Sequence, residues 1–513
     1  MRRVVLLALI FAAFSGVAEA ACPRGAQCGR LTVALDHSGA TPGTQSLAYA
    51  LVPATGPRTG TIVFLAGGPG QAALPLTADV VELLKPVRAS HDIVMVDQRG
   101  TGDSDAVECA DVRECAQRLG ARRAFLNTTE TAHDLEDLRV ALAADKLTLL
   151  GVSYGTKVAA EYARRYPART AALVLDSPVP VDGLNAMGEM QMMSAPRVLR
   201  EVCTPGLCRR TIRDPGGTLE AAVARVRRRA VRGPLVDPSG RVHRRAATES
   251  HVLQALAASD TSPGLRAGLP AALASLAKGD AAPLLHLTEV AATRDADLNP
   301  ARLLATLCAE SRLPWAPDSP IDTRQAALDA FRPPGPISAR TLREDSTAEI
   351  CKTWPPTPRP APVSLQGPDV PVLTLSGRHD LRTPLEDARR TAAQYPNATL
   401  LAVPGVGHSV LRSDPTGCAA SRLLAFLRGR RVAPCASRNP FTGAPYAPAT
   451  LRALRPTRLP GRAGRVLSAV RVTLTGIAFD TAAHGRNRFR LPGLRSGYVQ
   501  GTRRALRLHK VEW

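Results

Sequence analysis

The sequence predicts an α/β fold in which a mostly parallel, doubly wound sheet carries a large helical insertion and a small β-rich C-terminal appendage. Short apolar runs alternate with helical segments before residue 180 and again after residue 365, which is typical of βαβ crossovers in a parallel sheet. The stretch between them has helical spacing and no strand-like run. The resulting division is a signal peptide at 1–20, a core at 21–180 and 366–437, a helical lid at 181–365, and an appendage at 438–513.

The first residues have the pattern of a cleavable secretory signal peptide. Arg2 and Arg3 precede the apolar run Val4–Phe14, and the small residues Ala18 and Ala20 suit a cleavage site. The run is too short to span a bilayer, and no later stretch of about 18 apolar residues exists. We therefore expect a secreted or periplasmic protein without a transmembrane segment.

The ten cysteines agree with export, because an even number of cysteines behind a signal peptide favours disulfides. No C-x-x-C pair occurs, and no histidine lies near the cysteines at ligand spacing, so no metal site is predicted. The sequence leaves the connectivity open, and pairing of neighbours along the chain is our hypothesis. It joins Cys22 with Cys28, Cys109 with Cys115, Cys203 with Cys208, Cys308 with Cys351, and Cys418 with Cys435.

The chain is strongly basic, with a net charge of +22 from 66 Lys and Arg against 44 Asp and Glu. More than half of this charge lies after Asn439, where fourteen basic residues face two acidic ones. Such a surface suits nucleic acid or an anionic cell envelope. An aromatic content of 4% and the lack of any RRM, OB or helix-turn-helix signature argue against nucleic acid. An Arg-rich solvated surface is favoured, and loose attachment of the basic tail to an anionic envelope stays open.

Four apolar strands are expected before residue 100, at Leu31–Leu35, Leu47–Val52, Thr61–Leu65 and Asp92–Val96. The third ends in GGPG, where the backbone can fold close to a ligand. We expect the N–H of Gly68 to be an oxyanion donor, although such a sequence is more often only a turn. The fourth strand runs into DQRGTGDS, which we interpret as a structural turn in which Asp97 pairs with Arg99.

The stretch 146–167 combines a short apolar strand, the sequence G-x-S-x-G at Gly151–Gly155, and a helix with apolar residues at spacings of one, three and four. This order is the pattern of a nucleophile elbow, in which a strained turn exposes the hydroxyl of Ser153 above the sheet. The helix N-terminus places the N–H of Tyr154 where it can bind an oxyanion. The motif also occurs by chance, so its interpretation depends on the partners that the chain supplies.

Two further strands end in an acid and a histidine. Val370–Leu375 leads to a turn with Asp380, and Thr399–Val403 leads to a turn with His408. Catalytic groups gather at the C-terminal ends of strands in an open parallel sheet, and the chain order Ser, Asp, His is known from one hydrolase fold. Taken singly, His408 could equally well be a structural residue of its loop, and Asp380 could pair with a neighbouring arginine. Together with the elbow they predict a catalytic triad.

The lid is expected to consist of helices separated by Pro- and Gly-rich turns, and to end at the Pro-rich run 354–358. In the appendage, Val466–Leu474 and Arg503–Val511 alternate and are expected to be strands. The predicted lid helices are Leu219–Val231, His251–Ala258, Leu269–Leu276, Leu284–Ala292, Ala301–Cys308 and Arg324–Phe331.

Five motifs together resemble the α/β-hydrolase fold, and more narrowly the secreted proline-iminopeptidase and tripeptidyl-aminopeptidase group of serine exopeptidases. The resemblance covers about residues 30–180 and 365–437, and Cys418–Cys435 resembles the C-terminal piece of tripeptidyl-aminopeptidase-like enzymes. Many relatives have a histidine before GGPG where this chain has Ala66, a change that keeps the backbone donors. The motifs are GGPG at Gly67–Gly70, DQRGTGDS at Asp97–Ser104, GVSYGT at Gly151–Thr156, the D-x-x-T-P turn at Asp380–Pro384, and GVGH at Gly405–His408.

The resemblance implies a secreted serine aminopeptidase that releases amino acids or short peptides, of tripeptidyl or prolyl type, from free N-termini through an acyl-enzyme. Ser153 would be the nucleophile, His408 the base and Asp380 the group that orients it. The N–H groups of Tyr154 and Gly68 would form the oxyanion hole. No metal or organic cofactor is required, and we expect a monomer.

Members of this family bind the free α-amino group of the substrate through acidic residues, often in the lid. Glu310 is the candidate in this chain, against the simpler interpretation of an exposed glutamate at a helix end.

Two other functions stay open. One is a secreted carboxylesterase or lipase of the same fold, and the other is a non-catalytic binding protein on a hydrolase scaffold.

Overall fold

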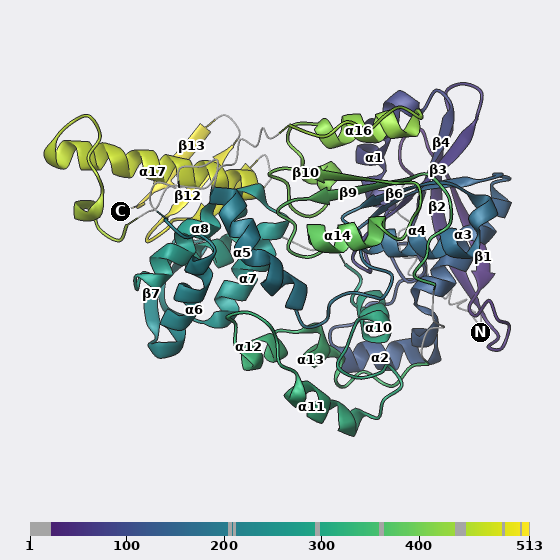
Figure 1. The fold of residues 1–513 in the computed structure, drawn as a ribbon, viewed down its shortest axis with the longest axis horizontal. Helices are drawn as coiled ribbons and strands as arrows, with labels where there is room; N and C mark the ends of the chain where they lie inside the picture. The colour runs from purple at the N-terminus through teal and green to yellow at the C-terminus, as the bar shows by residue number, and fades with distance from the viewer. Residues whose placement is uncertain are drawn as a thin grey trace, which may run out of the picture.

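The computed structural model describes residues 22–203, 208, 212–292, 298–358, 364–436, 448–484, 488–502 and 505–511. The predicted signal peptide at 1–20 lies outside these residues. Figure 1 shows three regions: a large sheet with helices on both sides at the right, a helical cap at the lower centre and left, and an appendage with one long helix and a small sheet at the upper left.

Eight strands form the main sheet: β1 Gln27–Ala34, β2 Thr44–Val52, β3 Gly60–Leu65, β4 His91–Val96, β5 Leu147–Val152, β6 Thr170–Asp176, β9 Val372–Gly377 and β10 Ala398–Val403. Their order across the sheet is β1-β2-β4-β3-β5-β6-β9-β10. β2 is antiparallel to both of its neighbours, and the remaining pairs are parallel. The predicted mostly parallel sheet is therefore confirmed.

Helices cover both faces of this sheet, which explains why its central strands are apolar along their whole length. They are α1 Thr77–Leu84, α3 Thr128–Ala141, α4 Tyr154–Arg165, α14 Leu385–Ala392, α15 Val410–Ser413 and α16 Cys418–Leu427, with short 3-10 helices at Leu74–Leu76, Lys85–Val87 and Pro167–Arg169. α2 Val112–Leu119 and the 3-10 helix Gly120–Phe125 pack against the cap helix α10 Pro300–Glu310 instead. In β3, Ile62 and Phe64 pack with α1 and α16, whereas Val63 and Leu65 pack with α3 and α4. This alternation follows from the two-residue period of a strand.

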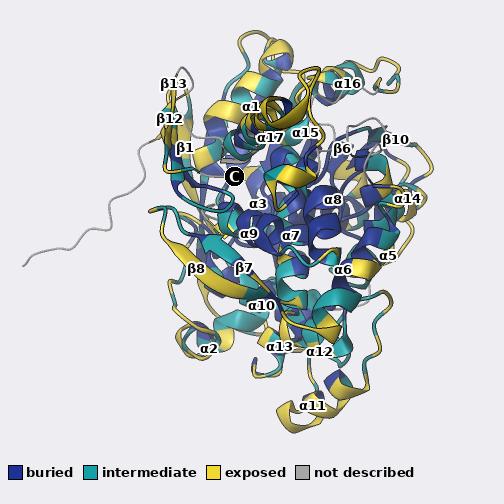
Figure 2. Cartoon of the chain, turned by 90° about the vertical axis from the view of Figure 1, so that its left-hand side faces the viewer, coloured by how far each residue is buried: buried dark blue, intermediate teal, exposed yellow. Residues whose placement is uncertain are grey.

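The cap joins β6 to β9 and is mainly helical, as predicted. It contains α5 Glu189–Cys203, α6 Gly217–Arg228, α7 Glu249–Asp260, α8 Pro263–Ala277, α9 Ala282–Ala292, α10 Pro300–Glu310, α11 Ile321–Ala330, α12 Ala339–Glu344 and α13 Thr347–Cys351. Figure 2 shows α7, α8 and α9 as the buried centre of this region. The cap also holds an antiparallel hairpin, β7 Val231–Val236 and β8 Val242–Ala247, which the sequence did not predict. Most β8 residues are exposed, so no apolar alternation marks the strand.

The appendage consists of the 3-10 helix Leu451–Ala453, the long helix α17 Gly461–His484, and an antiparallel sheet of β11 Arg488–Pro492, β12 Tyr498–Thr502 and β13 Ala505–His509. The small sheet agrees with the predicted β-rich appendage. The strand predicted at Val466–Leu474 is wrong, because these residues lie in α17. Their apolar residues satisfy a period of two and a helical spacing equally well. Ile477 of the helix joins the apolar core of the cap, which fixes the appendage to it.

Five disulfides join the cysteines in the pairing that the sequence analysis proposed: Cys22–Cys28, Cys109–Cys115, Cys203–Cys208, Cys308–Cys351 and Cys418–Cys435. The fourth ties α10 to α13 within the cap. Such pairs are consistent with an extracellular protein. Among the described residues, no helix combines the length and the apolar character needed to cross a membrane.

Candidate active site

Ser153 lies on the sharp turn between β5 and α4. Its backbone has φ 54° and ψ −121°, a strained conformation for a residue other than glycine. The two motif glycines let the turn form, because a Cβ at Gly151 would collide with the Gly155 carbonyl and one at Gly155 with the Leu65 carbonyl. Ser153 is 7% exposed, so the nucleophile predicted by the motif lies in an almost closed site.

Asp380 and His408 meet beyond the C-terminal ends of β9 and β10. His408 Nδ1–H donates to Asp380 Oδ2 over 2.9 Å. The other carboxylate oxygen accepts the N–H groups of Arg382 and Thr383 at 2.9 and 2.8 Å, and the Thr383 hydroxyl donates to Oδ2 at 2.9 Å. The buried carboxylate thus holds the imidazole in one orientation and tautomer, with Nε2 as the nitrogen that can act as a base.

The charges of this pair stabilise each other. Burial raises the pKa of Asp380, but the His408 charge and the hydrogen bonds outweigh it, so the pKa lies below its ordinary value. Burial lowers the pKa of His408, but the Asp380 carboxylate outweighs it, so the pKa lies above its ordinary value. The acid therefore stays ionised and favours the imidazolium that forms when the base accepts a proton.

Asp176, the last residue of β6, ties the serine turn to the histidine loop. Its carbonyl accepts the Ser153 N–H at 2.8 Å. Its buried carboxylate accepts the N–H groups of Val410 and Leu411 at 2.8 and 2.9 Å. The sequence analysis did not single out Asp176, because an acid at the end of a strand carries no motif of its own.

The acid and the base are in contact, but the serine is not yet hydrogen-bonded to the base. In the described structure the His408 ring bonds to Asp380 and Thr383, and no hydrogen bond joins it to Ser153 Oγ. Catalytic hydrogen bonds are often long in unliganded enzymes and tighten when substrate binds. The assignment of Ser153 therefore depends on its elbow geometry and on its tie to the histidine loop.

Two backbone segments border Ser153, as a pair of oxyanion donors requires. Tyr154 is the first residue of α4, so its N–H has no acceptor within the helix. The loop with Gly68 packs against the serine, because a Cβ added at Gly67 would lie 3.0 Å from Ser153 Cβ. Gly68 has φ +105°, which glycine adopts without strain.

Buried polar side chains of the DQRGTGDS motif hold this loop in place. Asp97 Oδ1 accepts the N–H groups of Ala73 and Leu74 at 2.6 and 3.0 Å. Gln98 Nε2 donates to the Ala66 carbonyl at 2.9 Å. The motif thus positions the loop that carries Gly68, a role that the sequence alone did not show.

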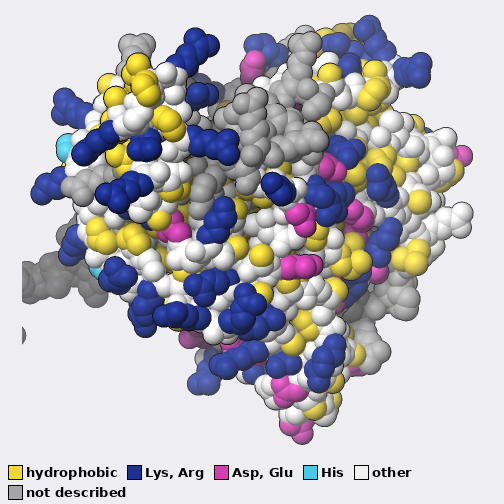
Figure 3. Space-filling model, turned by 60° about the vertical axis from the view of Figure 1, so that its left-hand side comes forward, with side chains coloured by type: hydrophobic (Ala, Val, Ile, Leu, Met, Phe, Trp, Pro, Cys, Tyr) yellow, Lys and Arg dark blue, Asp and Glu magenta, His cyan; other side chains and the backbone are white. Residues whose placement is uncertain are grey.

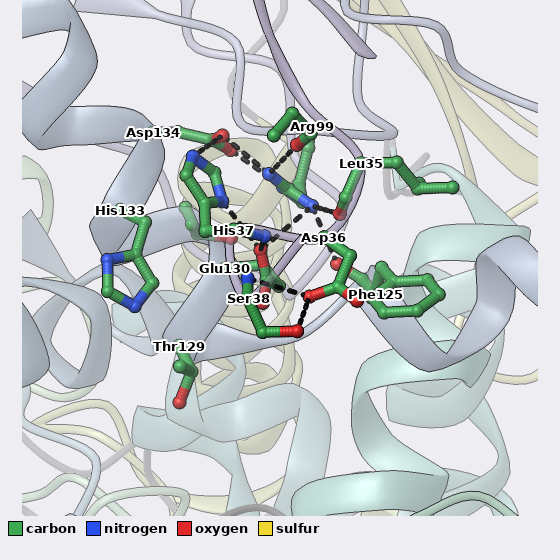
Figure 4. A network of polar contacts seen from close by, with 12 residues as sticks. Leu35, Asp36, His37, Ser38, Arg99, Phe125, Thr129, Glu130, His133 and Asp134 are labelled. Atoms are coloured by element: carbon green, nitrogen blue, oxygen red, sulfur yellow. Dashed lines mark hydrogen bonds and ion pairs between the residues drawn. The ribbon is translucent and has the colours of Figure 1, made fainter. Parts of the chain in front are cut away.

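Arg99 pairs with Asp134 and not with Asp97, so the predicted Asp97–Arg99 pair is wrong. The two guanidinium–carboxylate hydrogen bonds measure 2.7 and 2.5 Å, and the arginine also donates to the carbonyls of Leu35 and Phe125. Figure 4 shows Arg99 at the centre of this network. Backbone N–H groups already occupy the Asp97 carboxylate, so Arg99 pairs with Asp134 of α3.

The cap contacts both of the loops that would carry out the chemistry. The Asn299 N–H, just before α10, donates to the Gly70 carbonyl at 2.9 Å. The His408 N–H donates to the Asp260 carbonyl, at the end of α7, at 3.0 Å. His408 is only 4% exposed. The cap therefore encloses the site from the oxyanion side and from the side of the base.

Asp260 is a candidate functional residue that the sequence analysis missed. Its Oδ1 accepts the Leu381 N–H at 2.8 Å, while its buried Oδ2 has no hydrogen-bond partner and lies 3.5 Å from Arg382 Nε. Burial, followed by the nearby Asp380 carboxylate, raises the pKa of Asp260 to about 6. In sequence it is merely an acid at the end of a helical segment, 120 residues before the acid that it approaches.

Asp260, Asp380 and His408 bring three buried ligand atoms within 4.8 Å of one another, close enough to hold a metal ion. Their existing partners favour a hydrogen-bonded cluster. His408 Nδ1 already faces Asp380, and two arginines, Arg266 and Arg382, contact Asp260. These positive charges oppose a cation at the same place.

Glu310, the proposed amine anchor, has its carboxylate engaged inside the protein. It accepts the N–H of Thr128 at 2.5 Å and forms an ion pair with the buried Lys157. Burial raises the pKa of Glu310, but Lys157 outweighs it, so the pKa lies below its ordinary value. The charge of this glutamate is therefore already neutralised by a lysine of α4.

Comparisons with known proteins agree with this geometry. Residues 60–206 match the family model for the alpha/beta hydrolase fold, and residues 337–434 match the model for TAP-like protein. Serine protease Hip1 of Mycobacterium tuberculosis is 28% identical over 460 residues, which cover 80% of this chain and 87% of the relative. Tripeptidyl aminopeptidase of Streptomyces lividans is 30% identical over 193 residues, which cover 31% of this chain and 36% of the relative.

A probable proline iminopeptidase of Streptomyces coelicolor is 34% identical over 116 residues, which cover 22% of this chain and 31% of the relative. These similarities include the strands that carry the serine turn and the TAP-like segment that carries Asp380 and His408. The chain therefore has the α/β-hydrolase fold with a TAP-like C-terminal segment, and its similarities to curated peptidases identify it as a serine peptidase.

Proposed function

We propose that this serine peptidase is a secreted aminopeptidase that releases amino acids or short peptides, of tripeptidyl or prolyl type, from free N-termini. The observation that carries the proposal is the buried Asp380–His408 pair, tied through Asp176 to a serine in elbow geometry beneath a cap. The proposal includes the division of the chain into a catalytic core at 21–180 and 366–437, a cap at 181–365 and an appendage at 438–513.

In the proposed reaction, Ser153 Oγ attacks the carbonyl carbon of the scissile bond while His408 Nε2 takes its proton. Asp380 stabilises the resulting imidazolium through the 2.9 Å hydrogen bond. The N–H groups of Tyr154 and Gly68 receive the oxyanion. The imidazolium then protonates the leaving amine, and a water molecule repeats the sequence on the acyl-enzyme, which releases the N-terminal fragment.

The enclosure of the site supports removal of short fragments over cleavage inside long chains. Ser153 and His408 are almost fully buried, and the cap contacts both the oxyanion loop and the histidine loop. A long polypeptide could reach such a serine only if the cap moved widely, whereas a chain end needs less space. Because the Glu310 carboxylate is paired with Lys157, the proposal does not depend on that residue as the anchor for the amine.

Parallel assays test the proposal. The mature protein should hydrolyse tripeptidyl or aminoacyl arylamides with a free N-terminus, and blocking the N-terminus by acetylation should abolish turnover. A folded Ser153→Ala variant should be inactive and should lose labelling by a fluorophosphonate. Turnover of short aryl esters without any turnover of arylamides would instead identify an esterase. A folded protein that neither reacts with the probe nor turns over substrate would identify a binding protein.

Secretion is a separate part of the proposal and has its own test. The five disulfides support it, because such bonds persist in oxidising compartments. Expression of the full chain in a bacterial host should give a processed form outside the cytoplasm, with an N-terminus near Ala21 by mass spectrometry. An unprocessed chain that stays in the cytoplasm would contradict the proposal and leave the peptidase assignment untouched.

A further inference from the structure

The apolar residues of α17 are only partly covered by the described residues. Ala469 is buried, and Ile477, closer to the C-terminal end of the helix, joins the apolar core of the cap. Closer to the N-terminal end of the helix, four large aliphatic residues are between 43% and 50% exposed: Val466, Leu467, Val470 and Leu474. At 100° per residue, their positions fall within a sector of about 100°, so they form one continuous stripe. Stripes of this kind on otherwise solvated helices mark interaction surfaces.

The stripe lies in a part of the chain that has no acidic residue. Between Asp414 and Asp480 the sequence contains neither Asp nor Glu. The Asp480 carboxylate is largely buried and lies 2.8 Å from His286 Nε2 of the cap. Five arginines on and just before the helix are exposed: Arg452, Arg455, Arg458, Arg462 and Arg471. Figure 3 shows the same imbalance, with dark blue side chains far more common than magenta ones on the left-hand side of that view.

We propose that this surface binds an anionic phospholipid membrane from outside, with α17 lying along the headgroups. We call it the α17 surface and define it by the four aliphatic residues, the exposed Leu459, and the five exposed arginines. Aliphatic side chains of an interfacial helix enter the boundary between headgroups and acyl chains. Arginines beside them attract anionic lipid, and each contributes about fivefold in affinity at low salt.

Charge decides between a membrane and a second copy of the chain as the occupant. A symmetric contact through the stripe would bring the same arginines of two copies together, without an acid on either side to pair with them. A bilayer with anionic headgroups offers opposite charge and an apolar layer to the same surface. The stripe is also too short to cross the bilayer, since its nine residues, 466–474, rise by only about 12 Å along the helix. The binding is therefore peripheral and reversible.

Sedimentation of the mature protein with lipid vesicles tests the proposal. Vesicles of phosphatidylcholine with about 30% phosphatidylglycerol should bind the protein, and vesicles of phosphatidylcholine alone should bind it at least about tenfold more weakly. Raising the salt from about 50 mM to about 500 mM should release most of the bound protein, because the arginines are exposed to screening. Equal binding to both kinds of vesicle would contradict the proposal.

A matched pair of variants separates the α17 surface from net charge. Leu467→Asp combined with Val470→Asp should lower vesicle binding by at least about tenfold, because charge replaces the inserted groups. Val140→Asp combined with Ile321→Asp is the control of equal charge, since these residues are 62% exposed on α3 and 45% exposed on α11, and it should leave binding unchanged. Both variants should keep the melting temperature and peptidase activity on soluble substrates. Unchanged vesicle binding by the double variant, or a dimer that this variant dissociates, would overturn the proposal.

Discussion

Replacing Asp260 by Asn tests whether the cap sets the charge of the catalytic histidine. The groups that face the His408 ring are Asp380, Thr383, Asp260, Arg382 and Asp176. The base must be neutral to accept the serine proton, and the negative charge of Asp260 favours the protonated imidazole. Removal of this charge should therefore lower the pKa of His408 and move the acid limb of kcat/KM to lower pH.

The size of the effect follows from the geometry. Two unit charges 4.8 Å apart interact by about 3 kcal/mol at an effective dielectric constant of about 20, which corresponds to about 2 pH units. Arg382, 3.5 Å from Asp260 and half exposed, neutralises part of that charge, so we expect a shift of about one unit. Because the pKa of Asp260 is itself about 6, the shift applies above pH 6, where the wild-type carboxylate is charged.

The assay is the pH dependence of kcat/KM on one arylamide substrate, with Arg382→Gln as the control of opposite sign. The Arg382 charge lowers the pKa of His408, so its removal should move the acid limb to higher pH. A general loss of structure would lower activity in both variants without shifting the two profiles in opposite directions. An active Asp260→Asn enzyme whose acid limb coincides with the wild type would refute the reasoning.

Three further predictions concern the nucleophile, the oxyanion loop and the buried ion pair. Ser153→Ala should lower kcat by at least about 10⁴-fold with its melting temperature kept, as measured on arylamide substrates; a residual rate near the wild type would exclude this serine as the nucleophile. Asp97→Ala frees the N–H of Ala73 and should lower kcat by about 100-fold with a smaller change in KM, so an unchanged kcat would contradict its positioning role. Glu310→Gln leaves Lys157 charged and buried, and should lower the free energy of unfolding in urea by about 3–5 kcal/mol; a second change, Lys157→Met, should restore part of it.

The core and the meeting of Asp380 with His408 could be predicted because each signal is local in sequence. A strand that is buried on both faces is a continuous apolar run, and glycines mark its end, as in β3 and β5. Asp380 and His408 each follow such a strand directly, so sheet topology alone brings them to one edge. The hydrogen bond between Asp380 and His408 agrees with this topology.

The features that were missed depend on contacts between distant parts of the chain. Asp260 acquires its role only where α7 of the cap meets the catalytic loops, and Glu310 acquires its partner only where α10 meets α4. The hairpin of β7 and β8 is mostly solvated and so lacks apolar alternation. In α17, the apolar residues serve two different surfaces, which produced an apparent strand period at Val466–Leu474.

The hydrogen bond from the His408 N–H to the Asp260 carbonyl links the cap to the loop of the catalytic base. Opening the cap to admit substrate would therefore disturb the position of the base. The nearby Arg266 strengthens the same connection, because its guanidinium bonds to the Asp260 carbonyl and to the Gly405 carbonyl. A cap that swings away to admit a chain end must give up these bonds and release the loop of the base. We therefore expect cleavage only while these bonds between the cap and the loop of His408 are intact.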